Sequence, residues 1–506
     1  MSVKGFTASL DTLVRARYPF VYLVSWEEKR VDTILAELAR RHGKQLVEWS
    51  AIRGLRRTGG ARAATAVESV TKPVETIVAI GKLADPSLVV LKDFHPYLDD
   101  PHVVRALREL NHDITNSYST VILVSPVLKI PVELEKDVTV LDVPLPDFND
   151  LLELLRGIAG VLKEQGRATI NLDRTDVERL VRAAIGLTLS EAENAFARAI
   201  VTDDRLDADD IQLVLEEKRQ VIRKSGLLEY FATDQDLGGV GGMVYLKQWL
   251  DRRAAAFGDK ARQFGLPEPK GLLLLGVQGC GKSMTAKAIA SQWKLPLLRL
   301  DMGRIFGSLM GSSEDNVRRA IRTAEGVAPV VLWIDEIEKG LSGARSSGET
   351  DGGTGARVFG ALLTWMQEKT APVFIVATAN NIADLPPELL RKGRFDEIFF
   401  IDLPSRAERA EIFAIHLRRR AREPTTFDLP KLADLARGFS GAEIEQAIVE
   451  GLYQAFDEST ELAQSHIERA LTETRPLSTT MEEKIADLRA WAATRARAAS
   501  PPTADD

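Results

Sequence analysis

Cysteine is almost absent from this sequence, which has one, Cys280, among 506 residues. A single cysteine excludes an intramolecular disulfide framework and fits a reducing cytosol. Long hydrophobic runs are missing too: none approaches the roughly 20 residues that span a bilayer, and LLLLGV and VVLWI have the length of core strands. The N-terminus lacks the apolar segment of a signal peptide. We therefore expect a cytoplasmic protein without a membrane span.

A surplus of positive charge is also missing, because 66 Lys and Arg face 73 Asp and Glu, a formal net charge of −7. This balance argues against a nucleic-acid footprint along the whole chain, although a local basic patch stays open. With 45% hydrophobic residues the chain can bury large cores, and its length is too great for a single one. We expect two or three domains.

Apolar strand-like runs alternate with helical stretches in both halves, a pattern typical of a parallel sheet with crossover helices. The first half has FVYLVSW, SLVVLKD and STVILVS, with a helix predicted from Glu27 to about His42. The second half has GLLLLGV, PLLRL, PVVLWID and PVFIVAT. Further helices are predicted throughout residues 147–225, from Ser405 to about Thr474 and from about Thr480 to Ala499.

Three segments of the first half recur in the second half, in the same order and at similar spacing. SLVVLKD at residues 87–93 matches PVVLWID at 329–335, and IPVEL at 130–134 matches LPPEL at 385–389. GLTLSEAENA and GFSGAEIEQA, which begin at Gly186 and Gly438, align without a gap. One match alone is weak because strands resemble strands, but the ordered set predicts two copies of one two-part module.

The second copy carries a glycine-rich loop between a strand and a helix. Its sequence GVQGCGKS fits G-x-x-x-x-G-K-[ST]. Glycines let backbone N–H groups face phosphate oxygens, Lys282 would neutralise the β- and γ-phosphates, and Ser283 would ligate Mg²⁺. The alternative, a glycine-rich turn that carries a lysine by chance, must match four fixed positions. The predicted nucleotide-binding residues here are Gly276, Val277, Gln278, Gly279, Cys280, Gly281, Lys282, Ser283 and Met284.

Polar side chains end the next two strand-like runs of this copy. VVLWI runs into Asp335, placed to hold Mg²⁺ through water, and Glu336, placed to orient and deprotonate the attacking water. Asn380 ends PVFIVATAN, where its amide could hydrogen-bond the γ-phosphate or that water. The alternative for each is a polar turn after a strand.

Two arginines, Arg391 and Arg394, follow in LLRKGRFDE. In isolation they would be solvated basic side chains. In a ring of P-loop modules they would reach the γ-phosphate of the neighbouring subunit, where arginine fingers are worth about 10³–10⁵ in rate in GTPases. We predict catalytic roles for both, together with Lys282, Glu336 and Asn380.

Together these motifs resemble the AAA family of ring ATPases, over roughly residues 231–474. The resemblance implies ATP and Mg²⁺ as ligands, a homohexamer or comparable ring, and an active site completed by the next subunit. Both ends of the chain also resemble AAA ATPases of cyanobacterial and algal-chloroplast genomes and their bacterial relatives, and a plastid-encoded protein would be stromal. The resemblance adds an adenine-contacting loop with Asp236 and Gly238, and lid positions His416, Gly441 and Ala442.

Two positions depart from the family. Its Asp-Gly-Phe intersubunit signal is absent, since Gln367-Glu368-Lys369 stands there. Its central-pore loop reads SLMG at residues 308–311, with Leu309 where threading machines carry an aromatic residue. H-E-x-x-H is missing as well, which excludes a membrane metalloprotease relative.

The first copy keeps Asp93 at the metal position, but Phe94 replaces Glu336, Lys136 replaces Arg391, and no glycine loop occurs. The expected fold is α/β, with tandem P-loop AAA modules, each a parallel sheet with flanking helices and a helical lid, and the first copy degenerate. The expected boundaries are 1–157 (degenerate α/β domain), 158–224 (lid-like domain), 225–404 (active core), 405–476 (lid) and 477–506 (C-terminal helix and tail).

The expected function is Mg-dependent ATP hydrolysis that remodels a macromolecular partner, chiefly protein. A slow ATP-gated switch or regulatory scaffold is the alternative, favoured by Leu309 and the missing intersubunit signal. Nucleic acid is a third candidate partner, for which a Gly-rich loop with Arg53, Arg56, Arg57 and Arg62 argues. That loop is either a solvated segment or a contact for an anionic partner.

Overall fold

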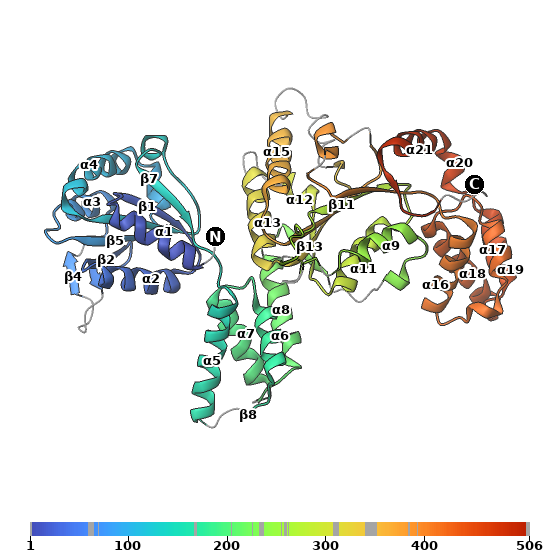
Figure 1. Ribbon diagram of the computed structural model, residues 1–506, viewed down its shortest axis with the longest axis horizontal. Coiled ribbons are helices and arrows are strands. Elements are labelled where there is room, and N and C mark those ends of the chain that lie inside the picture. Colours follow the sequence, from blue (N-terminus) through green and yellow to red (C-terminus); the bar gives the residue numbers. More distant parts are fainter. Residues whose placement is uncertain are drawn as a thin grey trace. The chain divides into compact units, whose positions relative to one another are not determined.

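Two seven-stranded sheets organise the computed structural model of the chain, one in each of two units, residues 1–217 and 218–506 (Figure 1). Each unit is described by itself. No helix in the described ranges is long and apolar enough to cross a membrane. The structure describes residues 3–58, 65–68, 70–165, 169–203, 205–224, 226–231, 237–254, 256–257, 261, 263–306, 313–339, 352–382, 385–391 and 393–501.

The first sheet has the strand order β4-β3-β2-β5-β6-β1-β7. Strands β2, β5, β6, β1 and β7 pair in parallel, and β3 and β4 extend the β2 edge in antiparallel fashion. The strands are β1 (Phe20–Val24), β2 (Gln45–Ser50), β3 (Gly54–Thr58), β4 (Thr65–Glu68), β5 (Ser87–Lys92), β6 (Thr120–Ser125) and β7 (Val138–Asp142). The flanking helices are α1 (Val3–Arg15), α2 (Glu28–Arg41), α3 (Pro73–Gly81) and α4 (Pro101–Ser117), with short turns η1 (His95–Asp99) and η2 (Val132–Leu134).

A helical part follows the first sheet and consists of α5 (Phe148–Gln165), α6 (Arg174–Ala184), α7 (Leu189–Asp203) and α8 (Asp210–Lys224). The prediction of helices throughout residues 147–225 is wrong at two places, because β8 (Thr169–Ile170) and β9 (Arg205–Leu206) form a small parallel ladder. Each strand has two residues, too few for a period-two pattern to show in the sequence.

The second sheet has the order β10-β12-β13-β14-β11-β15-β16, and all its pairs are parallel except β10–β12. Its strands are β10 (Leu228–Phe231), β11 (Gly271–Gly276), β12 (Leu297–Leu300), β13 (Val330–Ile334), β14 (Val373–Ala379), β15 (Glu397–Ile401) and β16 (Arg497–Ala498). Core helices are α9 (Val244–Asp251), α11 (Lys282–Trp293), α12 (Met302–Phe306), α13 (Ser313–Val327) and α15 (Gly352–Glu368), with turns η3 (Leu237–Gly239) and η4 (Pro387–Leu390). The lid consists of α16 (Arg406–Arg419), η5 (Pro424–Thr426), α17 (Leu429–Leu435), α18 (Gly441–Asp457) and α19 (Gln464–Glu473), and α20 (Leu477–Thr480) and α21 (Glu482–Arg495) follow.

The two sheets repeat one topology. The order β2-β5-β6-β1-β7 in the first corresponds to β12-β13-β14-β11-β15 in the second. The helical parts repeat as well: Gly186 and Gly438 both have positive φ, 95° and 83°, and the glutamate three residues after Thr188 or Ser440 accepts that residue's backbone N–H. These correspondences confirm the predicted tandem α/β modules with helical lids.

The sequence misplaces two segments. Arg56 and Arg57 lie on strand β3, which pairs with β2 and β4, whereas a loop was predicted; Arg62 lies outside the described residues. The C-terminal helix ends at Arg495, four residues before the predicted end at Ala499, because β16 continues the sheet beside β15. In both places backbone pairing at a sheet edge prevails over local propensity.

In the first module, Phe94 occupies the position that corresponds to Glu336 of the second. Its side chain is fully buried and packs edge-on against Trp49, with ring centroids 5.1 Å apart, and against Tyr97 at 5.6 Å. An aromatic cluster therefore closes the carboxyl edge of the first sheet where β5 ends.

A buried carboxylate ties the first sheet to its helical part. Glu27 precedes α2, its side chain is 7% exposed, and it lies 2.8 Å from the guanidinium of Arg30. Its Oε1 accepts a hydrogen bond from the backbone N of Leu189, the first residue of α7, at 2.6 Å. Arg30 also donates to Pro144 O at 2.7 Å and to Asp150 at the start of α5 at 3.3 Å. Glu27 thus joins α2 to α7, and Arg30 joins α2 to α5.

We expect Glu27→Ala to loosen this junction. The change leaves the Leu189 N–H unpaired and Arg30 short of one partner, and breaking a buried pair costs about 3 kcal/mol. Hydrogen exchange of the peptide that starts α7 should accelerate by roughly a hundredfold. Glu28→Ala, at a neighbouring side chain that is 48% exposed, is the matched control. Equal exchange in the two variants would contradict the proposed tie.

Candidate active site

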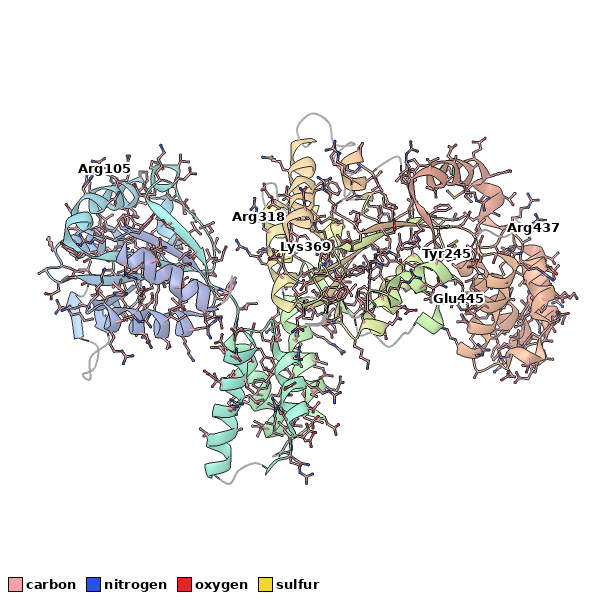
Figure 2. The ribbon with its side chains drawn as sticks, viewed as in Figure 1. Arg105, Tyr245, Arg318, Lys369, Arg437 and Glu445 are labelled. Carbon is pink, nitrogen blue, oxygen red and sulfur yellow. The ribbon has the colours of Figure 1, made fainter. Side chains whose placement is uncertain are left out.

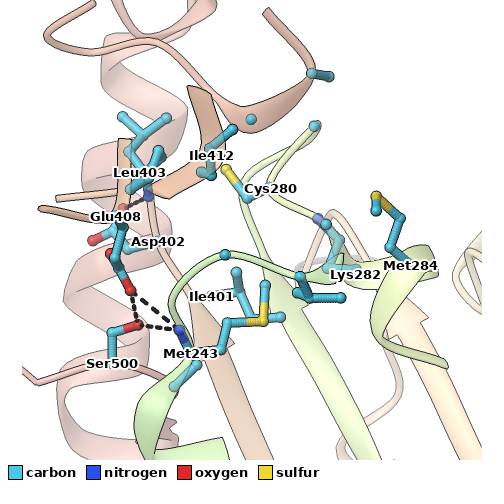
Figure 3. A pocket seen from close by; sticks show the side chains of 18 of the residues that line it. Met243, Cys280, Lys282, Met284, Ile401, Asp402, Leu403, Glu408, Ile412 and Ser500 are labelled. Atoms are coloured by element: carbon cyan, nitrogen blue, oxygen red, sulfur yellow. Dashed lines mark hydrogen bonds between the residues drawn. The ribbon is translucent and has the colours of Figure 1, made fainter. Parts of the chain in front are cut away.

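A cavity of about 890 Å³ lies at the carboxyl ends of β11, β13, β14 and β15 in the second module. Figure 3 shows part of its lining, with Ser500 and Met243 at one end and Lys282 and Met284 at the other. Ligands of open parallel sheets bind at this edge. The lining comes from the loop before α9, the loop between β11 and α11, the ends of β13 to β15, the lid and the C-terminal tail.

The glycine-rich loop forms the floor of the cavity. A side chain at Gly276 would put Cβ 1.9 Å from the carbonyl oxygen of Ile401, and Gly281 has φ +86°, so both positions require glycine. The residues from Gln278 to Met284 line the cavity, whereas the predicted Gly276 and Val277 lie outside the lining, at the end of β11.

Lys282 points back into this loop. Its Nζ donates to the carbonyl oxygens of Gly276 and Val277, at 2.7 and 2.6 Å. Burial lowers the pKa of Lys282 to about 8, because a low-dielectric site disfavours the charged form. The ammonium is thus fixed in position at one end of the cavity by backbone carbonyls.

Thr378 on β14 contacts both acidic residues that follow β13. Its hydroxyl donates to Asp335 Oδ1 at 2.7 Å and accepts from the backbone N of Glu336 at 2.9 Å. Ser283 Oγ also donates to Asp335 Oδ1, at 3.2 Å. The sequence analysis did not single out Thr378, although a polar residue within the apolar run PVFIVATA could have indicated a role in the site. Asp335 is therefore oriented from two sides.

Asn380 and Glu336 lie together just beyond the ends of the adjacent strands β14 and β13. Asn380 Nδ2 donates to Glu336 Oε1 at 3.0 Å, and Lys339 forms an ion pair with the other carboxylate oxygen. Glu336 has φ +47°, an uncommon backbone conformation for a non-glycine residue. The buried carboxylate of Glu338, which the sequence did not single out, accepts the backbone N of Asn380 at 2.8 Å, and burial raises its pKa.

Arg391 and Arg394 stand apart from these groups. Both follow η4, where the guanidinium of Arg394 donates to the carbonyl oxygen of Glu388. Among the described residues that line the cavity, neither arginine is included. The structure therefore does not bring the two predicted fingers to the cavity of their own chain.

The lid closes on the glycine loop at the start of α18. The backbone N of Ala442 donates to the carbonyl oxygen of Gly279 at 3.0 Å, and Gly441 lines the cavity beside it. His416 on α16 is buried, and its Nδ1 lies 3.4 Å from Glu445, which Figure 2 labels on the lid. Burial lowers the pKa of His416 and favours the neutral ring.

The loop before α9 borders the same end of the cavity as the lid. Gly239, Val240, Gly241 and Met243 line it. The predicted Gly238 lies in the adjacent turn η3, outside the lining, and Asp236 lies outside the described residues, as does the SLMG segment at 308–311.

The C-terminal tail is an unexpected part of the lining. Ala498, Ala499, Ser500 and Pro501 border the cavity together with Arg489 of α21. Their sequence gives no indication of this position, because the tail is held largely by backbone pairing with β15.

Comparison with known proteins shows extensive similarity along the whole chain. Residues 272–403 match the AAA family, ATPases associated with various cellular activities. Residues 6–143 and 149–225 match the N-terminal and second domains of SpoVK-like AAA ATPases.

Three algal relatives, each an uncharacterized AAA domain-containing protein ycf46, align over nearly the full length. The protein of Guillardia theta is 40% identical over 492 residues, 96% of this chain and 95% of the relative. That of Pyropia yezoensis is 41% identical over 501 residues, 98% and 99% of the two chains. That of Trieres chinensis is 39% identical over 502 residues, 98% of each chain. These matches confirm the resemblance seen in the motifs.

Cys280 should be inert in the folded protein. The side chain is buried in the glycine loop, and burial raises the pKa of its thiol to about 12. The thiolate is the reactive form, so on the order of 10⁻⁴ of the thiol is ionised at pH 8. We expect N-ethylmaleimide to modify the native protein far more slowly than the urea-unfolded one. The rate for the native protein should rise about tenfold per pH unit. Mass spectrometry checks both rates, and equal rates would show that the thiol is accessible.

Proposed function

The chain belongs to the AAA ATPase family, and from this membership we propose that its second module hydrolyses ATP with Mg²⁺ to remodel a macromolecular partner, chiefly protein. A cytoplasmic or stromal site of action is part of this proposal.

One set of contacts carries the proposal. Ser283, Asp335, Thr378, Glu336 and Asn380 form a continuous hydrogen-bonded series. The series comes from three elements that meet at the carboxyl edge of the sheet, next to the glycine loop. A hydroxyl and a carboxylate that would ligate a cation thus lie beside a second carboxylate that would act as base, and this combination supports phosphoryl transfer to water.

The residues fit Mg²⁺ as the metal. Ser283 supplies a hydroxyl and Asp335 a carboxylate 3.2 Å away, and both are the hard oxygen ligands that this ion takes. A magnesium site uses few protein ligands because waters and phosphate oxygens complete it. When bound, the ion would neutralise charge on the β- and γ-phosphates.

Glu336 is the proposed general base. Its carboxylate accepts a hydrogen bond from the Asn380 amide on one oxygen and forms an ion pair with Lys339 through the other, so both oxygens are fixed in position. The Lys339 side chain is 70% exposed, so its ion pair is weak and can yield to water. Asn380 would orient the attacking water beside this base.

Lys282 and the lid would hold the nucleotide. The ammonium donates to two carbonyl oxygens of the glycine loop and can exchange them for phosphate oxygens. At the other end, Gly239 to Gly241, His416 and the start of α18 at Gly441 and Ala442 would enclose base and ribose.

Assembly into a homohexamer or similar ring would complete the site. Arg391 and Arg394 stand outside the lining of their own cavity, which supports a role at the phosphate of a neighbouring subunit. The first module would bind no nucleotide, because Phe94 is buried where a base is needed, and would instead contact a partner or pack in the assembly.

A slow ATP-gated switch remains a second candidate, favoured by one contact. Lys369 stands where the family carries its intersubunit signal, yet its Nζ donates to Val373 O of its own chain at 2.6 Å (Figure 2). Burial lowers the pKa of Lys369 to about 8. A side chain that points into its own chain in this way cannot contact a neighbouring subunit. The sites of the ring would therefore hydrolyse ATP with little coordination.

Two variants test the proposed site. Lys282→Ala should weaken ATP binding by about a hundredfold or more, since a buried charge that faces phosphate is lost. Glu336→Gln should bind ATP normally but turn over at least about a hundredfold more slowly, because the base is lost. Calorimetry and steady-state phosphate release measure the two effects. Turnover near that of the wild type in Glu336→Gln would remove Glu336 from the mechanism.

Mixing two inactive proteins tests the ring. Arg391→Ala/Arg394→Ala should bind ATP but hydrolyse it at least about a hundredfold more slowly, and Lys282→Ala should lack the phosphate contact. If the arginines act across an interface, some mixed rings place an intact pair beside an intact site, and activity partly returns. Native mass spectrometry establishes that mixed rings form. Mixed rings without any recovered activity would show that the arginines serve their own subunit or none.

A further inference from the structure

The tail after α21 returns to the core at the end of β15. Arg497 and Ala498 pair in parallel with Phe399 and Phe400, and Ala499 N donates to Phe400 O at 2.9 Å. Ala499 is 2% exposed within the core that contains Leu272 and Phe399. The tail is therefore a built part of the sheet.

The tail also provides the partners for the start of α9. The carbonyl oxygen of Ala499 accepts the backbone N–H groups of Tyr245 and Leu246, at 2.9 and 3.2 Å. Met243, at the N-cap, has φ +56° and makes no side-chain cap. The first N–H groups of a helix have no partner within it, so here the tail satisfies two of them. The tail thereby fixes α9 and the loop that precedes it.

Ser500 reinforces the contact of this loop with the lid, in which the backbone N of Met243 also donates directly to Glu408 Oε1 at 3.2 Å. Its hydroxyl donates to Glu408 Oε1 at 2.5 Å and accepts from the backbone N of Met243 at 3.2 Å. Glu408 is the third residue of α16, and its other carboxylate oxygen accepts the backbone N of Ser405 at 2.9 Å. Arg489 of α21 pairs with Asp402, 2.8 Å away, in the segment that leads from β15 to the lid. The loop before α9 and the lid thus both contact the tail, and the segment that leads from β15 to the lid contacts α21 just before it.

The same contacts extend to the glycine loop. Met243 Sδ accepts a hydrogen bond from the hydroxyl of Thr285 on α11 at 3.4 Å, and a side chain at Gly281 would lie 3.3 Å from Met243 Cε. Figure 3 shows Ser500 and Glu408 clustered around the backbone of Met243, on the side of the cavity away from Lys282, with the Met243 side chain reaching toward the glycine loop. If phosphates lie at Lys282, this cluster borders the base and ribose.

We propose that the tail Arg497–Pro501 is part of the nucleotide site: it forms the wall at the base end and, through Ser500, reinforces the contact between the loop before α9 and the lid. This inference rests on the proposed nucleotide site. Two ligands or segments that stabilise the same arrangement favour each other reciprocally. A bound nucleotide should therefore hold the tail in place, and weakening the contacts of the tail should lower the affinity for nucleotide.

Hydrogen exchange on the full-length wild-type chain gives the first measurement, with ADP as the probe so that turnover plays no part. ADP should slow exchange in the C-terminal peptide that contains Ala499 and in the peptide that starts α9, as well as in the glycine loop. The amide of Ala499 and those of Tyr245 and Leu246 report directly on tail docking, since each takes part in one of the contacts above.

A point variant gives the second measurement. Ser500→Ala should raise the Kd for ADP roughly fivefold to tenfold, in line with the loss of a hydrogen bond to a charged group. Thr480→Ala is the control, since this exposed hydroxyl donates to Leu477 O within α20. Its affinity should equal that of the wild type.

The outcomes separate the inference from the function on which it rests. Protection of the tail together with weaker binding by Ser500→Ala supports the proposal. Protection of the glycine loop alone, with Ser500→Ala binding like the wild type, overturns the tail's role and leaves the nucleotide site standing. Absence of ADP binding by the wild type overturns both.

Discussion

The close approach of Gly276 to Ile401 is the constraint on which the second module depends. A side chain at Gly276 would meet the Ile401 carbonyl oxygen at 1.9 Å, so β11 and β15 can align at this level only through bare backbone. The glycine loop leaves β11 at this point, and the segment to the lid leaves β15 immediately after it. Val277 N donates to the same Ile401 carbonyl at 3.1 Å. The glycine loop at the floor of the cavity and the segment that leads to the lid therefore both start at this contact.

The two modules use a similar lid contact with different partners. In the second, the N–H of Ala442, the second residue of α18, donates to the carbonyl of Gly279. In the first, the N–H of Leu189, the first residue of α7 and one position earlier in the alignment, donates to the carboxylate of Glu27. A neutral carbonyl on a loop can be displaced by a ligand, whereas a buried carboxylate paired with Arg30 is costly to separate. The lid contact of the first module is accordingly the charge-assisted one of the two.

The sequence predicted the fold and the position of several polar residues of the cavity better than its walls. Spacing alone located Lys282, Asp335 and Asn380, because a strand-to-helix loop and the ends of parallel strands fix where such residues lie. It could not locate the tail, since Ala499 acts through backbone N–H and C=O groups that every residue carries. It also read the segment around Arg56 as a loop, because edge pairing leaves little trace in side-chain pattern.

The pairing of β16 with β15 has a consequence for how the module is made. Between these neighbouring strands lie the lid helices α16 to α19 and then α20 and α21, so the contact is non-local and needs the whole lid to have been synthesised. Such contacts form late and slowly. Until they form, β15 presents an open edge, which is the kind of surface that recruits other chains. A newly synthesised chain must therefore pass through an aggregation-sensitive interval that ends only when its tail has docked.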